Sequence, residues 1–558
     1  MLLFCIYVGM HIVENKSKQG KKIYHSVLLR ESYRVGGKVR KRTIANLSSC
    51  KPEEIAALKL ALAHKDNLAE LGSLEESVDL EEGLAVGAAW TVHQLAKRIG
   101  IERAFGNELA GKLALWQVLA RVLDQGSRLS AVRLAKVHAL GDVLALTRGF
   151  DENDLYENLR WLADHQAGIE KTLFSLGRTE APELFLYDVT SSYLEGQKNF
   201  FGAYGYPRDG KRSKKQIVIG LLCDERGEPV STEVFAGNTR DTETFDSQVA
   251  KAAQRFGCRR VTLVGDRGMI KAPQIENLPQ GFHYITAITK PQIRSLLAKG
   301  VIQLDLFDQD IAEVAHRGLR YILRRNPVRV EEIRTNRMAK LASLEALVSK
   351  KNDYLEEHAK AKVATALRDV GKKMNQLKIA PWLHLGAAER TLRLEIDEEA
   401  LKEASLLDGC YVIKTDLPRE AADTQIIHDR YKDLAMVEQA FRSCKTDFLE
   451  VRPVYVQREK STRGHVLVVM LAYMIVRALR EAWAPLDVTV EEGLRHLSTL
   501  CSIKMTVKNH PSCLKIPRPR ETSRHLLKAL KVSMPLALPH REVPVVTRKK
   551  LTENRNLP

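Results

Sequence analysis

Between residues 184 and 288, apolar runs of strand length follow one another in an order that constrains the fold more than any other feature of the chain. The first run covers residues 184–193, and two more flank the turn DERGE within residues 216–237. Two helical patterns then alternate with two further apolar runs, at 242–256, 261–266, 272–278 and 283–288. Short apolar runs rich in β-branched and aromatic residues are typical of buried strands. Three consecutive strands followed by strands joined through helices predict an α/β layered core.

Two aspartates lie in these predicted strands, where a carboxylate needs a partner. Asp188 interrupts the first strand, and Asp266 ends the run VTLVGD, directly before Arg267 and Gly268. Aspartate is disfavoured in strands, and a buried carboxylate must be solvated, paired or bound to a cation. Each aspartate taken alone is most simply structural, so a site is indicated only if further acidic groups join them.

A third acidic residue lies on a predicted amphipathic helix at residues 431–445, YKDLAMVEQAFRSCK. Apolar residues recur there every three or four positions, as on the buried face of a helix. Tyr431, Glu438 and Lys445 instead follow a seven-residue spacing, which returns to within about 20° of the starting direction, about 10 Å further along the helix. Arg442, four residues after Glu438, shares that ridge. The simpler alternative is a partly buried helix with a solvated charged edge.

Asp188, Asp266 and Glu438 can converge on one point from two strands and a helix. A few hard oxygen ligands, completed by water and phosphate, are what a phosphoryl-transfer site with two Mg²⁺ ions requires. A carboxylate flanked by a phenol and cationic side chains suits a metal ion held against a nucleic-acid backbone. Taken together, the three acids favour a metal site over three structural carboxylates.

These motifs resemble those of bacterial insertion-sequence DDE transposases, from the branch whose ribonuclease-H-like core is interrupted by an insertion domain. That branch carries its third acid in the signature Tyr-(2)-Arg-(3)-Glu-(6)-Lys, which Tyr431, Glu438 and Lys445 match in spacing. The segments YDVTSSYLEG and GDRGM are similar to those around the family's first and second acids. The resemblance covers residues 183–480 and implies the same α/β architecture.

One position departs from that signature, because Leu434 stands where the family has its arginine. The resemblance implies that the arginine helps to grip the DNA end. Either Arg430 or Arg442 substitutes for it, or this DNA contact is absent. The departure keeps open a decayed, non-catalytic DNA-binding protein, and a metal-dependent DNA nuclease without joining activity is the other alternative.

The resemblance implies a DNA transposase that cleaves and joins DNA by metal-dependent phosphoryl transfer. Asp188, Asp266 and Glu438 would be catalytic and would bind two Mg²⁺ ions, for which Mn²⁺ can substitute. The substrates would be the terminal inverted repeats of the insertion sequence and then target DNA, held by a homodimer in a synaptic complex. The side chains expected to contact DNA are Tyr431, Arg442, Lys445, Lys211, Arg212, Lys214 and Lys215. The last four belong to a Gly-containing basic loop at 208–215, and a merely solvated loop is the alternative for them.

The composition agrees with a polyanionic partner. The chain has 558 residues and a formal charge of +18, which favours nucleic acid and predicts salt-sensitive binding. Its eight cysteines include no CxxC pair, which favours a reduced interior over zinc sites or a disulfide framework. No apolar run approaches the ~20 residues of a membrane span. We therefore expect a cytoplasmic bacterial protein that associates with the nucleoid and makes no membrane contact.

The N-terminal residues 1–71 are predicted to form a small basic β-rich region, a hairpin with its turn at 35–38 followed by a helix at 52–71. The basic residues of the hairpin are Lys18, Lys21, Lys22, Arg30, Arg34, Lys38, Arg40, Lys41 and Arg42. Such a sheet can contact a DNA groove or backbone, and a charged solvated hairpin is the alternative. Residues 72–85 are acidic and weakly periodic, which predicts a linker.

Four further regions complete the predicted organisation. Residues 86–180 are helical throughout and are expected to contact DNA or a partner subunit; their helix–Gly–helix rhythm is compatible with a helix-turn-helix, although an ordinary helical hairpin is simpler. The catalytic core would comprise residues 181–290 and 409–485. Between them, residues 291–408 would form an insertion domain, predicted to be partly helical. Residues 486–558 would form a basic C-terminal tail containing a short helix.

Overall fold

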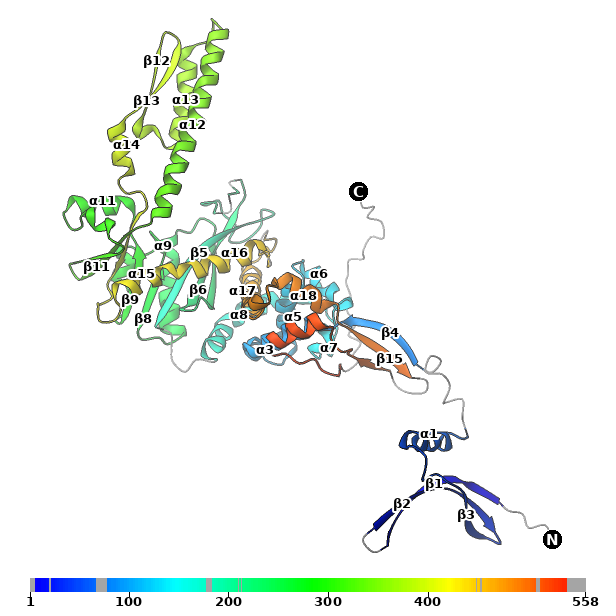
Figure 1. Ribbon diagram of the computed structural model, residues 1–558. Coiled ribbons are helices and arrows are strands. Elements are labelled where there is room, and N and C mark those ends of the chain that lie inside the picture. The colour runs from blue at the N-terminus through cyan, green and yellow to red at the C-terminus, as the bar shows by residue number, and fades with distance from the viewer. Residues whose placement is uncertain are drawn as a thin grey trace. The chain divides into compact units, whose positions relative to one another are not determined.

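The computed structural model describes residues 6–19, 22–66, 78–176, 183–208, 210–211, 213–447, 449–451, 454–507 and 512–538 (Figure 1). The chain divides into two compact units. The first is drawn from the segments Met1–Ala85, Leu500–Arg518 and Met534–His540. The second is drawn from Val86–Thr499, Pro519–Ser533 and Arg541–Pro558, and it contains every element of the predicted catalytic core.

The centre of the second unit is an eight-stranded mixed sheet of order β10-β11-β14-β9-β8-β5-β6-β7. Its first strands are β5 (Leu184–Tyr193), β6 (Gln216–Asp224) and β7 (Pro229–Ala236), paired antiparallel. β8 (Val261–Gly265) is parallel to β5, and β9 (Phe282–Ala287) is parallel to β8. The predicted order of these strands along the chain is therefore confirmed. The strands could be recognised because a strand buried on both faces of a sheet is a nearly continuous apolar run.

Three later strands extend this sheet beyond β9. β14 (Cys410–Thr415) pairs antiparallel with β9, as expected for a strand that re-enters the core. β11 (Leu319–Arg325) pairs with β14, and β10 (Ala312–His316) pairs with β11 at the edge. The sequence assigned β10 and β11 to the insertion, because nothing local to residues 312–325 indicates that their partner begins at Cys410.

Helices cover the sheet and connect its strands. α9 (Asp241–Ala250) continues into a π-helical turn, η3 (Lys251–Arg255), and α10 (Ala272–Glu276) precedes β9. A core cluster between the strands and these helices consists mainly of aromatic and aliphatic side chains, including Phe174, Phe185, Tyr187, Leu222, Phe245, Leu263 and Tyr284. Burial of this cluster fixes the sheet that carries the predicted acids.

Residues 87–176 form the predicted all-helical region. Its helices are α3 (Gly87–Arg98), α4 (Ile101–Phe105), α5 (Leu109–Leu123), α6 (Arg128–Arg133), α7 (Leu140–Val143) and α8 (Glu152–Ser175). Gly100, with φ of 91°, joins α3 to α4, so the helix–Gly–helix pattern is real. α4 has only five residues, which is short for a DNA-recognition helix. Trp116 on α5 is fully buried, as expected for a core residue.

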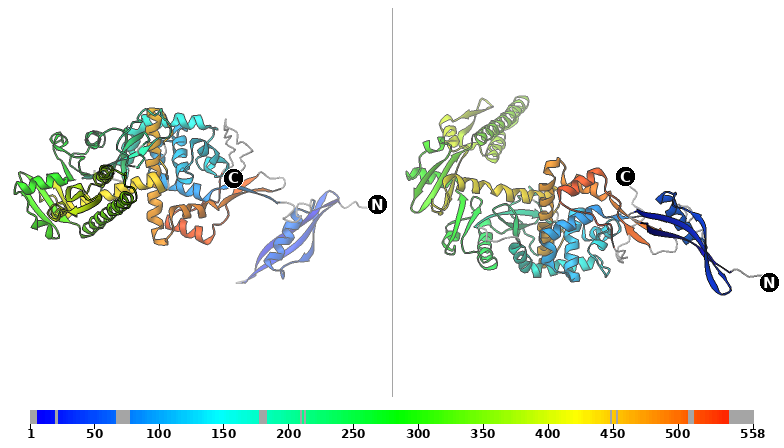
Figure 2. Two further views of the ribbon diagram at one scale, coloured as in Figure 1. Left: turned by 90° about the horizontal axis from the view of Figure 1, so that it is seen from above. Right: turned by 60° about the horizontal axis from the view of Figure 1, so that its bottom comes forward.

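The long apolar helix α17 (Glu459–Trp483) packs against α5, α8 and strand β7. Figure 2 shows this orange helix beside the blue and cyan helices of residues 87–176. Two shorter helices, α18 (Val490–Ser498) and α19 (Glu521–Ala529), pack near it, the second where the tail helix was predicted.

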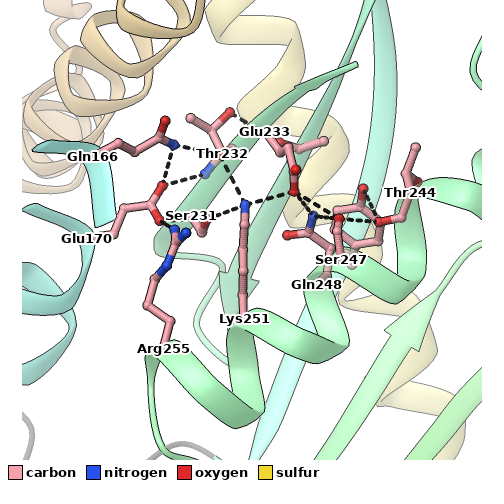
Figure 3. A network of polar contacts seen from close by, with 12 residues as sticks. Gln166, Glu170, Ser231, Thr232, Glu233, Thr244, Ser247, Gln248, Lys251 and Arg255 are labelled. Carbon is pink, nitrogen blue, oxygen red and sulfur yellow. Dashed lines mark hydrogen bonds and ion pairs between the residues drawn. The ribbon is translucent and has the colours of Figure 1, made fainter. Parts of the chain in front are cut away.

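A buried polar network fastens α8 to the edge strand β7 (Figure 3). The carboxylate of Glu170 on α8 is fully buried and forms an ion pair with Arg255 of the π-helical turn. Glu170 also accepts hydrogen bonds from the Ser231 hydroxyl at 2.9 Å and from the Thr232 backbone N–H at 3.2 Å. These partners satisfy the buried charge of Glu170. Packing of α8 against a surface without them would leave that charge unpaired, which favours this contact between α8 and β7.

The inserted segment between β11 and β14 carries its own small core. It consists of α12 (Pro327–Glu357), α13 (Val363–Leu377), β12 (Leu383–Ala388), β13 (Thr391–Ile396) and α14 (Glu398–Ser405). Trp382 lies within the apolar cluster between these elements, so its side chain has a packing role there. The segment is partly helical, as predicted.

The first unit contains two sheets. β1 (Ile6–Gln19), β2 (Lys22–Val35) and β3 (Lys38–Asn46) form an antiparallel sheet, followed by α1 (Pro52–Ala63). The predicted turn is confirmed: Val35 pairs with Lys38, and Gly36 and Gly37 have positive φ values of 58° and 78°. Two positive φ values match the right-handed twist of a hairpin and favour glycine. The helix is shorter than predicted and ends at Ala63.

The predicted linker at 72–85 is wrong in its second half. β4 (Val78–Ala85) pairs with β15 (Cys501–Val507), beside β16 (Cys513–Lys515) and β17 (Ala537–Leu538). β4 has charged side chains and a partner more than 400 residues away, so no local pattern marks it as a strand. The free cysteines of the described residues form no disulfide, and none of the described helices is long and apolar enough to cross a membrane.

Candidate active site

The two predicted aspartates lie side by side at the centre of the sheet. β5 and β8 run parallel with Tyr187 opposite Gly265, so Asp188 and Asp266 follow at the same level. The strand ladder therefore brings together two carboxylates that are 78 positions apart in the sequence. Asp266 follows directly after the strand, and its Oδ1 accepts a 2.6 Å hydrogen bond from the Arg267 backbone N–H.

Glu438 completes the cluster from the helix α16 (Leu434–Arg442), which packs on β5. Two pockets of about 530 and 500 Å³ adjoin at this point, and both are lined by Asp188, Asp266 and Glu438. The three acids thus form the wall common to two depressions, where a chain-like ligand entering one pocket and leaving by the other would pass them.

Burial and neighbouring charges both act on the pKa of Asp188. Burial raises the pKa of Asp188 to about 7, and the negative charges of Asp266 and Glu438 add to the increase. A hydrogen bond from the Val189 backbone N–H and the charge of Arg208 act in the opposite direction but do not cancel it. The carboxyl group of Asp188 therefore takes up a proton more readily than an ordinary aspartate, and a cation bound beside it would favour its ionised form.

The donor set suits hard divalent cations, since it consists of carboxylate oxygens with space for water and phosphate. Within the described residues, no group of three or more His, Cys, Asp or Glu side chains is already gathered around one point. Unneutralised carboxylates repel one another, so we expect their oxygens to draw together when cations bind. The chemistry of the three acids fits a site for divalent cations.

The first pocket carries cationic and phenolic groups beside the acids. Tyr431 donates a 3.3 Å hydrogen bond from its hydroxyl to Asp266 Oδ1. Lys290, at the start of α11 (Lys290–Ala298), and Arg329, in the first turn of α12, also line this pocket. Each lies within the first turn of its helix, and the Arg329 backbone N–H is capped by the Asn326 side chain at 3.2 Å, so the anion-binding groups there are the two side chains.

Arg267 lines both pockets, and the second pocket has three further cations of its own. Arg208, Arg442 and Lys445 line it together with the acids. Arg208 forms an ion pair with Asp241, and its backbone N–H donates a 3.0 Å hydrogen bond to the Ser191 hydroxyl. Positive side chains therefore flank the carboxylates on both sides, which is favourable for a polyanion crossing the site.

The predicted helix 431–445 is divided in the structure. α15 (Thr424–Lys432) and α16 are separated by Asp433, and a π-helical turn, η6 (Ser443–Asp447), follows α16. The predicted apolar stripe is confirmed, with Leu434, Val437, Ala440 and Phe441 buried. The predicted ridge does reach the site, because Tyr431 lines the first pocket, Lys445 the second, and Glu438 both.

Leu434 is 7% exposed and forms part of the wall of the first pocket. Of the two arginines considered as substitutes, Arg430 forms an ion pair with Asp433 at 3.5 Å. Arg442 lines the second pocket, on the other side of the acids from Leu434. The first pocket instead has Lys290 and Arg329, contributed by elements that the signature does not include.

The basic loop 208–215 contributes to the site through a residue that the sequence did not single out. Arg208 lines the second pocket, whereas Lys211, Lys214 and Lys215, which the structure also describes, line neither. Lys214 forms an ion pair with Glu195 at 2.8 Å, and Lys215 donates a 3.3 Å hydrogen bond to the Gln197 carbonyl. Arg212 lies outside the described residues. The only sequence signal for Arg208 was that it belongs to a basic loop. That signal does not show which cation of the loop lies beside the acids.

Comparison with known proteins identifies the family of the chain. Residues 179–475 match the family model of the transposase DDE domain, so the chain belongs to the DDE transposases, enzymes that catalyse DNA transposition. Residues 11–78 match the model of the IS1634 family transposase N-terminal domain, which makes this an insertion-sequence DDE transposase. DDE transposase domains generally depend on divalent metal ions.

No curated protein shows a significant match to the chain. Among solved structures, one match is to a piggyBac transposase, described as a cryo-EM structure of a synaptic complex with hairpin DNA. It has 10% sequence identity and a TM-score of 0.34, and the match covers 80% of this chain and 76% of that one. A likeness at that TM-score carries no weight for the fold or the site described above.

Proposed function

We propose that this transposase cleaves the ends of its insertion sequence and joins them to target DNA, using Asp188, Asp266 and Glu438 to hold two Mg²⁺ ions. The observation that carries the proposal is the position of the three carboxylates in the wall shared by two cation-lined pockets. When bound, such ions activate the attacking water or 3′-hydroxyl and stabilise the leaving oxygen.

The protein's own side chains would place the DNA for this reaction. Tyr431, hydrogen-bonded to Asp266, would fix the scissile strand beside the acids in the first pocket. Arg442 and Lys445 would bind phosphates in the second pocket. Two pockets, each with its own cations, suit a joining reaction, in which a DNA end and a target strand must meet at one centre.

The strand order supports a ribonuclease-H-like core. β5, β6 and β7 are consecutive and antiparallel, with β8 and β9 added in parallel on the other side of β5. We propose that the core is residues 181–325 together with 409–485, and that the true insertion is the segment of α12 to α14. This division moves β10 and β11 into the core because they lie in its sheet.

Other parts of the chain would bind DNA without taking part in the chemistry. The sheet β1–β3 exposes Arg40, Lys41 and Arg42 on one strand, and we propose that it contacts the terminal inverted repeats. Lys211, Lys214 and Lys215 would bind phosphate near the core. Because two DNA ends must be paired before joining, we propose a homodimer as the active assembly.

The test is Mg²⁺-dependent cleavage of a duplex carrying the ends of the insertion sequence. Glu438→Gln should lower cleavage at least 100-fold while DNA binding is retained, because a neutral amide is a poor ligand for a hard cation. Glu345→Gln, which removes an exposed charge from α12, is the matched control and should cleave normally. Equal cleavage by Glu438→Gln and the wild type would refute the assignment. Cleavage without any strand-transfer product would favour the nuclease alternative.

A further inference from the structure

Four exposed aromatic side chains lie close to the catalytic core but outside both acid-lined pockets. Phe200, Tyr204 and Tyr206 are 68%, 65% and 78% exposed, and Tyr455 is 70% exposed. In the described part of the chain, these are the four most exposed aromatic side chains. Exposure of this much aromatic surface is unfavourable in water, so a cluster of such rings indicates a surface that binds something.

The backbone beneath three of these rings is held in place. Ala203 and Gln216 exchange both backbone hydrogen bonds, at 3.2 and 2.9 Å. The side-chain amide of Gln216 donates to the carbonyl of Tyr206 at 3.0 Å. At Gly205, a Cβ atom would lie 2.0 Å from the Gly237 carbonyl oxygen, so the backbone around Gly205 packs directly against the backbone around Gly237. The rings are therefore presented outward by a fixed backbone.

The fourth ring belongs to a segment that runs beside this one. Leu194 and Val454 form a parallel β-bridge, and the backbone N–H of Phe200 donates to the Gln457 carbonyl at 2.9 Å. The side-chain amide of Asn199 also donates to the Val456 carbonyl at 2.6 Å. Tyr455 thus lies next to the segment that contains Phe200, although 255 positions separate them in the sequence. We call the four rings the aromatic platform.

Positive charge surrounds the platform and links it to the acids. Lys198 and Lys211 are exposed on the same loop as the three rings. The guanidinium carbon of Arg208 lies 6.0 Å from the centre of the Tyr206 ring, and Arg208 also lines the second acid pocket. Among the described residues nearby, Glu195 forms an ion pair with Lys214, and Asp241 forms one with Arg208. A strand leaving the acid pocket past Arg208 would reach Tyr206 first.

We propose that the aromatic platform stacks the unpaired bases of a DNA strand that extends from the acid pocket. This inference rests on the proposed function, because it takes DNA to be the ligand of that pocket. Alternating aromatic and basic residues are the pattern of single-strand binding surfaces: the rings stack on exposed base faces and the cations neutralise phosphates. Paired bases in a duplex offer no free face, so the platform should discriminate unpaired from paired DNA.

The test uses a duplex with a short oligothymidine tail and the same duplex without the tail. Affinity is measured by fluorescence anisotropy without divalent ions, so that no cleavage occurs. Loss of one stacked base lowers the affinity by about 5- to 150-fold. Tyr206→Ala should therefore lower the affinity for tailed DNA by that factor and leave the affinity for blunt DNA unchanged. Tyr206→Trp should retain binding, and a 2-aminopurine placed in the tail should be quenched by the wild type and by Tyr206→Trp but not by Tyr206→Ala.

The control is Tyr354→Ala, which removes an exposed ring from α12 and should change neither affinity. Equal binding of tailed DNA by Tyr206→Ala, or equal binding of an abasic tail by the wild type, would overturn the proposal. A change of oligomeric state in Tyr206→Ala, with tail affinity unchanged, would also overturn it and identify an interface between copies of the chain. The two proposals are tested by different measurements. Glu438→Gln tests the metal site through cleavage, and the affinity for the tail, measured without divalent ions, tests the platform whatever the outcome of that cleavage assay.

Discussion

Substitution of Gly464 by alanine tests how closely the long helix α17 approaches the helical region. A Cβ atom at Gly464 would lie 2.0 Å from the Leu159 carbonyl oxygen and 2.8 Å from its carbon, both in the backbone of α8. Because backbone atoms cannot rotate away, the two helices must separate by about 1 Å to reach an ordinary contact. In an unobstructed helix the same change stabilises by about 1 kcal/mol. Overpacking costs about 1–3 kcal/mol, so the expected net effect is a loss of up to about 2 kcal/mol.

The assay is calorimetric melting of the whole protein, with two control variants. Gly168 lies in α8 itself and Gly371 in α13, and a Cβ atom added at either position would have open space within 4 Å. Gly168→Ala and Gly371→Ala should therefore raise the melting temperature, whereas Gly464→Ala should lower it by up to about 2 °C. If all three variants melt at a higher temperature than the wild type, the backbones of α17 and α8 do not approach each other as closely at Gly464 as the structure shows.

Three further predictions follow from buried charges and from the acids. Glu170→Ala should destabilise the protein by about 3–5 kcal/mol, because it leaves Arg255 without its carboxylate; urea unfolding with Glu157→Ala, on the exposed side of α8, as control would show whether the loss is specific. Burial and the charges of nearby arginines hold the pKa of His465 well below its usual value, so the unfolded chain takes up this proton first. Stability is then complete above pH about 6.5 and falls as the pH drops below it, and His465→Asn should flatten that part of a melting-temperature profile. Burial and like charges raise the pKa of Asp188 to about 7, so it is largely protonated at pH 6 and ionised at pH 8. Mg²⁺ should raise the melting temperature more at pH 8 than at pH 6, and a Mg²⁺ effect that is equal at both values, or unchanged in Asp188→Asn, would argue against this carboxylate as a ligand.

Much of the catalytic core could be predicted from local patterns. β5 has the predicted bounds, and β6 to β9 follow in the predicted order, because an apolar run that is buried on both faces marks a strand wherever its partner lies. The convergence of Asp188 and Asp266 follows from the same information, since parallel neighbours place their residues at one level. Glu438 could be added because helical spacing shows which residues share a face.

Other features could not be obtained in this way. The pairing of β4 with β15 joins residues more than 400 positions apart, and β4 is too polar to indicate a buried strand. The break at Asp433 and the π-helical turn after Arg442 change the helix without changing its apolar spacing. Both depend on the surface against which an element packs, which is not encoded within the element.

The sequence by itself determined the class of the protein, the order of its core strands and the three acids, because hydrophobic periodicity and fixed motif spacings are properties of a continuous stretch of chain. Helical spacing also indicated Arg442 and Lys445, but only the tertiary structure showed the other cations that line the pockets. Arg208, Lys290 and Arg329 come from a loop and from the first turns of two helices, and no spacing relates them to one another. Tyr455 likewise joins the aromatic platform through contacts between distant segments, among them the bridge between Leu194 and Val454. Periodicity specifies which face of an element is buried, whereas the identity of the distant face that it meets is settled by packing of the whole chain.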